Sequence, residues 1–493
     1  MGADSAAAPE VADHTEPGYD YNPSMLTSVG VVVLLATMLL VGTAILALPI
    51  EMVMFFSMVV IMILLRIVGF SFRDVQDAAF DSVRQVIELL LILLSVGMLL
   101  SAWAMSGTIP TIINYGLELI SPTWFLPTAV LLCSVVSLFT GTSWGTMGSV
   151  GVALMAVGGG LGLSLPIVAG AVISGAYFGD KLSLLSDSTN LNAAITKTPL
   201  LTHIRYMLWT TGPAYVVTLV LFSVIGFAMP RRQNIGSEIE EITQGLASSY
   251  QLGLVTLIPL VVTLAMLLLR LPPFIAIVAG ALSGGAVAIL WQGMSFADVM
   301  TGLHSGYEST IGIEEVDGLV SGGGMLSMAG VVLLFMFAVA ISGLLQLGGY
   351  VQKILTAILQ KADTRRKLMV TTSPAMFLSV GLGASFSFGA VMVGTLFTPA
   401  YRRLGLRPQN LSRTLEDSGT VYDAFFPWAG GGVFAAGVLG VATVEYMPFM
   451  FFAYSSTIFG LILAITQFKV ATKQTQPVTE TIGIPDPERY RPR

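Results

Sequence analysis

Long apolar segments follow one another along almost the whole chain. A helix that crosses a bilayer needs about 20 predominantly apolar residues. Uninterrupted segments close to that length cover residues 26–48, 52–68, 86–105, 124–140, 207–229, 252–269, 274–291, 325–345 and 444–468. This pattern predicts an all-α polytopic membrane protein.

Further apolar segments are shorter or are interrupted by glycine and proline, at residues 146–163, 166–178, 369–384, 391–400 and 421–442. The chain has 52 glycines and 23 prolines, which suits a bundle of membrane helices. The sequence lacks the alternating strands of about ten residues that build an outer-membrane barrel. The interrupted segments are therefore assigned to the same helical bundle.

The composition agrees with this class. Hydrophobic residues make up 54% of the 493 residues and charged residues only 11%, whereas soluble domains carry roughly 25% charged residues. The sequence has no basic cluster that would indicate nucleic-acid binding.

The two ends of the chain are predicted to be tails. Residues 1–24 are acidic, without lysine or arginine, and are predicted to be disordered. Residues 469–493 are predicted to form a cytoplasmic tail. The single cysteine, Cys133, excludes an intramolecular disulfide and is read as a small core residue.

The second half of the chain resembles the first. The segment "LLSAWAMSGTIPTII" from Leu99 is similar to "AISGLLQLGGYVQKIL" from Ala340. Continuing the match pairs Ser143 with Ser385, and Asp180 with Asp417. The sequence therefore predicts transmembrane repeats at residues 25–232 and 251–468, joined by a linker at 233–250.

The charges of matching loops indicate that the two repeats have opposite orientations. Arg66, Arg73 and Arg84 mark the first loop as cytoplasmic, whereas its counterpart at residues 295–321 carries acids and no lysine or arginine. The signs reverse after the next helix, since residues 105–122 lack basic residues. Their counterpart contains Lys353, Lys361, Arg365, Arg366 and Lys367. Inverted repeats place a substrate site where they meet near the membrane midplane. Arg231 and Arg232 do not fit this arrangement, because they fall on the side predicted to be external.

The stretch "GDKLSLLSDSTNLNAA" from Gly179 places many polar residues directly after an apolar segment. On a continuous helix, one face would carry Asp180, Ser183, Asp187 and Asn190. The corresponding stretch in the second repeat would likewise align Glu416, Thr420 and Asp423. Carboxylates inside a membrane are costly and mark functional sites by default. The alternative is that both stretches are solvated cytoplasmic loops.

The charges of these two stretches do not balance. Their five acids are Asp180, Asp187, Glu416, Asp417 and Asp423. Lys181 is expected to neutralise its neighbour Asp180, and Arg413 to pair along its helix with Glu416 or Asp417. Five acids against two bases leave three negative charges. The surplus favours a cation held by carboxylate, hydroxyl and backbone carbonyl oxygens.

Other signals are weaker. The motif "GTSWG" from Gly141 matches a hydrolase nucleophile elbow, but it lacks the required preceding strand, and its counterpart "GASFS" breaks the pattern. We therefore expect no enzyme and no cofactor. Ser143 and Ser385 are instead predicted to open two helices and present hydroxyl groups to a ligand, with close helix packing as the alternative. His203 could sense pH near neutrality, or could simply lie at the membrane interface.

Two long motifs carry a family resemblance. "SGAYFGDKLSLLSDSTNLNAA" and "LSRTLEDSGTVYDAFFPWAGGGVFAAGVLGV" resemble the signature stretches of the NhaC family of sodium/proton antiporters, in the ion transporter superfamily. The resemblance spans residues 86–468. It implies two inverted repeats with broken helices or re-entrant hairpins, and cation/proton exchange across a bacterial cytoplasmic membrane. The family also includes exchangers that couple sodium and protons to malate and lactate.

The resemblance also implies a set of ion-binding residues: Asp180, Ser183, Ser186, Asp187, Thr189, Asn190, Glu416, Asp417, Ser418 and Thr420. The chain departs from the family pattern at Leu184, Tyr422, Asp423 and Ala429, and the bulkier, more acidic second half could alter which substrate fits.

We therefore predict a secondary antiporter that exchanges sodium for protons by alternating access. A carboxylate binds either a proton or a cation, so the two compete. Asp187 is expected to be the main exchanging acid and a sodium ligand, with Asp417 or Glu416 as its counterpart. The alternative is a sodium- or proton-coupled transporter of a small organic anion or an amino acid; a channel and a membrane enzyme fit less well. The predicted partners are sodium, protons and membrane lipid, and a homodimer is left open.

Overall fold

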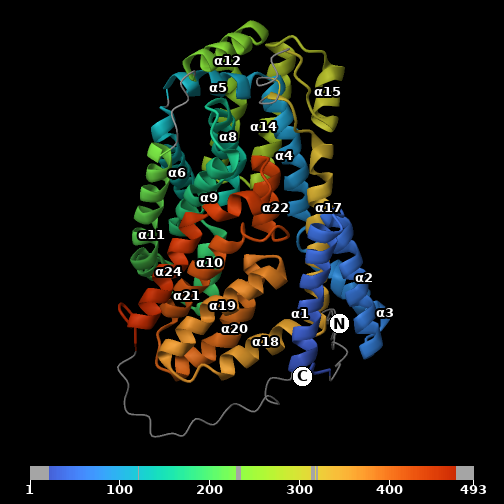
Figure 1. Ribbon diagram of the computed structural model, residues 1–493, viewed down its shortest axis with the longest axis vertical. Helices are drawn as coiled ribbons and strands as arrows, with labels where there is room; N and C mark the ends of the chain where they lie inside the picture. Colours follow the sequence, from blue (N-terminus) through green and yellow to red (C-terminus); the bar gives the residue numbers. More distant parts are fainter. Residues whose placement is uncertain (1–20, 120, 229–234, 312–316, 318–319, 473–493) are drawn as a thin grey trace, which may run out of the picture.

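The computed structural model describes residues 21–119, 121–228, 235–311, 317 and 320–472. Within these residues the chain is built from helices, with two isolated β-bridges, Tyr307 with Gly322 and Leu406 with Thr472 (Figure 1). The predicted terminal tails lie largely outside the described residues, and Arg231 and Arg232 lie wholly outside them.

The first half of the chain contains eleven α-helices: α1 (Met25–Leu40), α2 (Ile50–Val68), α3 (Phe72–Arg84), α4 (Ile87–Met105), α5 (Thr108–Leu119), α6 (Pro122–Thr140), α7 (Ser143–Thr146), α8 (Val152–Gly160), α9 (Leu165–Leu182), α10 (Asp187–Thr196) and α11 (Leu200–Ala228). The π-helical turn Met147–Gly151 joins α7 to α8 without a break. A second such turn, Val41–Ile45, extends α1.

The α-helices of the second half are α12 (Ile235–Ser249), α13 (Ile258–Leu268), α14 (Pro273–Leu290), α15 (Phe296–Ser305), α17 (Ala329–Leu347), α18 (Tyr350–Gln360), α19 (Arg365–Gly383), α20 (Phe386–Arg403), α21 (Pro408–Ser418), α22 (Gly430–Leu439), α23 (Thr443–Tyr446) and α24 (Phe451–Thr466). The predicted linker at residues 233–250 thus contains a helix, α12.

Among the described residues, seven helices are long and apolar enough to cross a membrane, or up to ten spans if each sharply bent helix pair counts as one. The prediction of an all-α polytopic membrane protein is confirmed. One predicted segment is wrong in detail. Residues 444–468 do not form a single helix, because α23 and the 3₁₀ turn Met447–Phe449 precede α24, and a proline inside that turn interrupts the helical hydrogen bonding.

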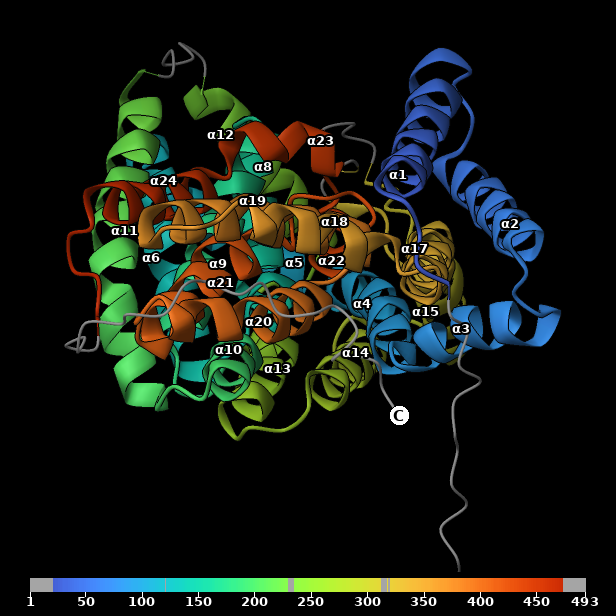
Figure 2. The same cartoon turned by 90° about the horizontal axis from the view of Figure 1, so that it is seen from below.

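The packing of the two halves is reciprocal. Helix α4 of the first half packs against α14 and α15 of the second, and α17 of the second half packs against α2 and α3 of the first. Seen from below, α1, α2 and α3 lie beside α17, on the side of the molecule away from α11 (Figure 2). Helices α3 and α15, like α5 and α18, lie towards opposite ends of the molecule (Figure 1). An inverted repeat would give this arrangement. The inverted orientation of the two halves stays a prediction.

Each half contains a helical hairpin with the same kind of turn. Helix α6 ends at Thr140, and the next residue, Gly141, reverses the chain with a φ of +74°. The Thr142 side chain then caps α7 by accepting a hydrogen bond from the Gly145 amide. Helix α19 ends at Gly383, the next residue, Ala384, has a φ of +53°, and the Ser385 side chain caps α20. A left-handed residue followed by a hydroxyl cap is a common way to end one helix and start another. Both hairpin tips therefore present hydroxyl groups.

Candidate functional site

The polar stretch after Gly179 does not form a continuous helix. Helix α9 ends at Leu182, and α10 begins at Asp187 after four intervening residues, with a bend of 46° between the two axes. Ser186 precedes the first residue of α10 in an extended conformation, without a capping hydrogen bond from its side chain. The predicted common helical face of Asp180, Ser183, Asp187 and Asn190 is therefore wrong.

The second-repeat stretch is also interrupted. Helix α21 ends at Ser418, and the 3₁₀ turn Thr420–Tyr422 follows before α22 begins at Gly430. The sequence suggested that Glu416, Thr420 and Asp423 share one helical face, and the structure shows that they do not. Both polar stretches instead combine a helix end with irregular backbone, and such backbone leaves polar groups free to contact a ligand.

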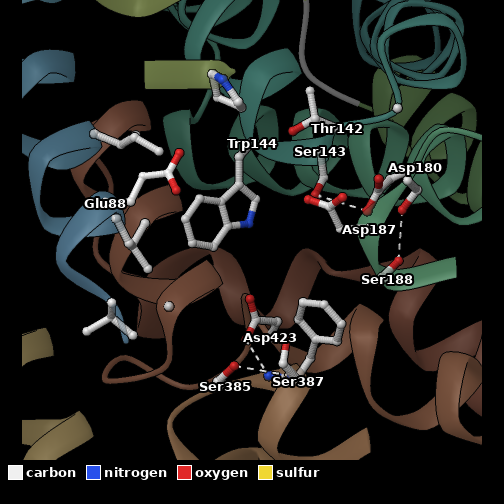
Figure 3. Close-up of a pocket in the computed structure, with 18 of the residues that line it drawn as sticks. Glu88, Thr142, Ser143, Trp144, Asp180, Asp187, Ser188, Ser385, Ser387 and Asp423 are labelled. Atoms are coloured by element: carbon white, nitrogen blue, oxygen red, sulfur yellow. Dashed lines mark hydrogen bonds between the residues drawn. The ribbon is translucent and has the colours of Figure 1, made fainter. Parts of the chain in front are cut away.

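A cavity of about 420 Å³ lies between these broken helices and the two hairpin tips (Figure 3). The residues that line it include six of the predicted site residues: Ser143, Asp180, Ser186, Asp187, Ser385 and Asp423. Helices α4, α7, α10, α14, α20 and α22 all begin at its wall. The structure thus brings together polar residues from both halves of the chain in one space.

Two carboxylates of this cavity are buried. Asp180 is 6% exposed and Asp423 is 2% exposed. The Ser143 hydroxyl donates to Asp180 Oδ2 at 3.3 Å, and the Phe386 amide donates to Asp423 Oδ1 at 3.1 Å. Neither carboxylate forms an ion pair with a described lysine, arginine or histidine. Buried charges are normally paired, so these two acids are suited to binding a cation.

Asp187 lines the same cavity but is exposed in it. The neighbouring polar groups stabilise the chain break instead of surrounding this carboxylate. Ser183 Oγ accepts a hydrogen bond from the Leu185 amide at 3.2 Å, and the Asn190 side chain donates to the Leu184 and Ser186 carbonyls. Thr189, also predicted for the site, donates to the backbone carbonyl of Asp180 at 3.4 Å. These residues hold the shape of the site.

Lys181 does not neutralise Asp180. Its ammonium group pairs with Asp417 and donates to Ser456 at 2.6 Å, and Thr210 donates to the same carboxylate at 3.0 Å. The expected pair of sequence neighbours is therefore wrong, because the end of α9 directs Lys181 towards α21 and α24. Asp417 lies outside the lining of the cavity. Asp187 was preferred over Asp180 as the exchanging acid because Lys181 was expected to neutralise Asp180. That reason no longer holds.

Glu416 lies in a second buried polar cluster. It accepts hydrogen bonds from Ser188 at 2.9 Å and from Asn192, and His203 Nε2 lies 3.8 Å from its Oε2. His203 Nδ1 contacts the Ser412 hydroxyl. The His203 side chain is fully buried. Its role in sensing pH stays a prediction.

The expected pairing of Arg413 along α21 is wrong as well. No described carboxylate forms an ion pair with Arg413, and its guanidinium lies over the Tyr206 ring of α11, 4.6 Å from the centroid. The remaining predicted residues, Ser418 and Thr420, are buried and have hydroxyl groups without a hydrogen-bond partner in the described structure. They lie outside the cavity lining.

Sequence reasoning missed several cavity residues, among them Glu88, Trp144 and Ser188. Glu88 is in the first turn of α4, where a lone acid at the start of a long apolar segment was a usable signal. Trp144 was read only as part of a rejected catalytic motif. Ser188 lies within the quoted polar stretch and donates to Glu416, which connects the cavity to the cluster behind it.

Known proteins resemble this chain over most of its length. The sequence model of the Na+/H+ antiporter family matches residues 175–468. The chain is 35% identical over 462 residues to the malate-2H(+)/Na(+)-lactate antiporter of Bacillus subtilis, covering 94% of this chain and 99% of that protein. It is also 35% identical to the Na(+)/H(+) antiporter NhaC of Alkalihalophilus pseudofirmus, covering 83% and 88%. A third relative is the arginine/ornithine antiporter ArcD of Halobacterium salinarum, 32% identical and covering 94% and 96%.

The fold and these similarities define a multi-pass membrane transporter of the bacterial inner membrane. The chain belongs to the Na+/H+ antiporter family, which confirms the resemblance to NhaC proteins.

Proposed function

We propose that the protein exchanges sodium ions for protons by alternating access. The observation that carries this proposal is the pair of buried cavity carboxylates, Asp180 from the first half of the chain and Asp423 from the second, which form no ion pair with a described base. A sodium ion would supply the missing positive charge. The carboxylate oxygens and the hydroxyl groups of Ser143 and Ser385 are the ligand types that hard cations prefer.

Exchange follows from competition for the same groups. A carboxylate that has taken up a proton is neutral and no longer attracts sodium, so each ion displaces the other. Asp180 lies in the last turn of α9, just before the chain break, and Asp423 follows the 3₁₀ turn after α21. A change of charge at either acid therefore acts next to backbone that is not held by regular α-helical hydrogen bonds. Asp187, at the first position of α10, is the third acid of this proposed site.

A second candidate keeps the fold but adds an organic solute. The cavity is larger than one ion requires, and six helices begin at its wall. Helix N-termini attract carboxylate groups through their free amides and partial positive charge. The names of the Bacillus subtilis and Halobacterium salinarum relatives refer to malate, lactate and amino acids. Sodium or protons would then be the coupling ion.

The site assignment is tested with purified protein in acid-loaded proteoliposomes. Adding sodium outside should raise the internal pH through the wild-type protein. Asp180→Asn and Asp423→Asn should each abolish this response, because an amide fills the same volume but cannot alternate between proton and sodium. Asp77→Asn is the matched control, since the Asp77 side chain on α3 is exposed beside Arg73 and lies outside the cavity lining. Normal exchange by both cavity variants would show that the cation binds elsewhere.

A further inference from the structure

The cavity is large enough for an organic molecule. Its volume of about 420 Å³ falls within the range of roughly 300–1,000 Å³ that is typical of small-molecule sites. A single water molecule in the liquid occupies only about 30 Å³. A sodium ion with a few ligands would leave most of this space unfilled.

The charges at the cavity wall are of one sign. Four acids line it, Glu88, Asp180, Asp187 and Asp423, and the lining contains no lysine, arginine or histidine among the described residues. Glu88 forms no ion pair with a described base. In Figure 3, Glu88 lies on one side of the Trp144 indole, and Asp180 and Asp187 lie on the other. The acids therefore flank the aromatic ring instead of forming one compact cluster.

Helix N-termini favour the charged form of two of these acids, Glu88 and Asp187. Glu88 is in the first turn of α4 and Asp187 is the first residue of α10. The partial positive charge of a helix N-terminus stabilises a carboxylate placed there. All four acids belong to the cavity lining, so an anionic solute would meet carboxylates from several elements. A positively charged solute would be attracted at contact.

Aromatic groups complete the wall. The Trp144 indole stacks on Phe434, with ring centroids 4.7 Å apart, which fixes its orientation. Phe335 and Phe386 also line the cavity. An ammonium group or an alkyl chain binds favourably against an indole face. The wall thus offers acids to either side of an apolar, aromatic middle.

We propose that this cavity binds an organic cation with primary ammonium groups separated by a short alkyl chain. One ammonium group contacts Glu88, the chain lies along Trp144, and the other ammonium group contacts the acids of the broken helix. This proposal rests on the proposed function, because the same aspartates would take up sodium. Sodium and the organic cation are therefore expected to compete.

The test is binding to the purified full-length protein in sodium-free detergent solution, measured by isothermal titration calorimetry. The probes are diaminoalkanes of three to six carbons, with malate for comparison. At least one diamine should bind saturably, sodium should displace it, and malate should not bind. Glu88→Gln should raise the dissociation constant of that diamine by about tenfold or more, as expected for losing a charge-assisted hydrogen bond.

Glu51→Gln is the matched control. Glu51 is also a glutamate in the first turn of a long apolar helix, α2, but it lies outside the cavity lining. This variant should leave the dissociation constant of the diamine within about twofold of the wild-type value, well below the effect of a lost charged hydrogen bond.

Three results would overturn the proposal: no diamine binds, malate binds in its place, or the two glutamine variants behave alike. Vesicle assays separate this proposal from the proposed function. Sodium/proton exchange without diamine binding refutes only the organic-cation site, whereas diamine binding without sodium/proton exchange refutes only the ion-exchange function.

Discussion

Lys181, near the end of α9, forms a buried ion pair with Asp417 of α21, and the two side chains are 0% and 1% exposed. The residues are 236 positions apart in the sequence, one in each half of the chain. The contact joins the helices that precede the two chain breaks. It therefore fixes the relative position of the segments that carry Asp180 and Asp423.

Breaking this pair should strongly destabilise the protein. Lys181→Met leaves the Asp417 carboxylate buried without its counter-charge, at a cost of about 3–5 kcal/mol. The apparent melting temperature in detergent should fall accordingly. Replacing both partners, as Lys181→Met with Asp417→Leu, should recover much of the loss, because no unpaired charge then remains.

Lys367→Met provides the matched control. Lys367 pairs with Asp363 on the surface, where the two side chains are 57% and 60% exposed. Its loss should cost less than about 1 kcal/mol. Equal melting temperatures for the two single variants would contradict a structural role for the buried pair.

Close packing of α9 against α6 should depend on glycine. A Cβ atom at Gly179 would lie 2.3 Å from the Ser134 carbonyl oxygen and 2.7 Å from the Leu138 amide nitrogen, both on α6. Gly179→Ala must therefore push the end of α9, including Asp180, away from α6. We expect a loss of about 1–3 kcal/mol in stability, together with reduced sodium-driven proton movement, measured by thermal unfolding and in proteoliposomes.

The control for this prediction is Gly212→Ala on α11, where a Cβ atom would meet nothing within 4 Å. That variant should keep its activity and gain up to about 1 kcal/mol from better helix propensity. If Gly179→Ala melts and transports as well as Gly212→Ala, α9 does not approach α6 as closely as the structure describes.

The sequence predicted the membrane helices well because their signal is local. A long apolar segment such as residues 86–105 gives helix α4 almost to the residue, since backbone groups in lipid must bond within their own helix. The broken helices were harder to locate. A four-residue break between Leu182 and Asp187 depends on side-chain bonds such as those of Ser183 and Asn190, which periodicity does not reveal.

The charge pairs of the site could not be predicted in the same way. Lys181 stands beside Asp180 in the sequence, yet it pairs with Asp417. Arg413 is within one helical turn of Glu416, yet it lies over Tyr206. Both predictions used spacing along one helix, whereas tertiary packing decides which partner a long basic side chain reaches. Three of the five predicted acids, Asp180, Asp187 and Asp423, line the cavity, whereas the fourth acid of its lining, Glu88, was missed.

The inverted orientation of the two halves can be tested by cysteine labelling. The only native cysteine, Cys133, is buried, so wild-type protein should give little background. Ala297→Cys on α15 should react with a membrane-impermeant maleimide from outside intact cells. Gln76→Cys on α3 and Lys361→Cys after α18 should react only after permeabilisation. Labelling of Gln76→Cys and Ala297→Cys from the same side would contradict inverted repeats.

Simultaneous recording of sodium and proton movement in one preparation tests the central claim most directly. Wild-type protein in acid-loaded proteoliposomes is given radioactive sodium outside, with no organic solute on either side. Sodium exchange for protons predicts that sodium uptake and a rise in internal pH occur together, and that both stop when the proton gradient is collapsed. A pH response that requires an added carboxylate or amine, or sodium uptake without proton movement, would contradict it.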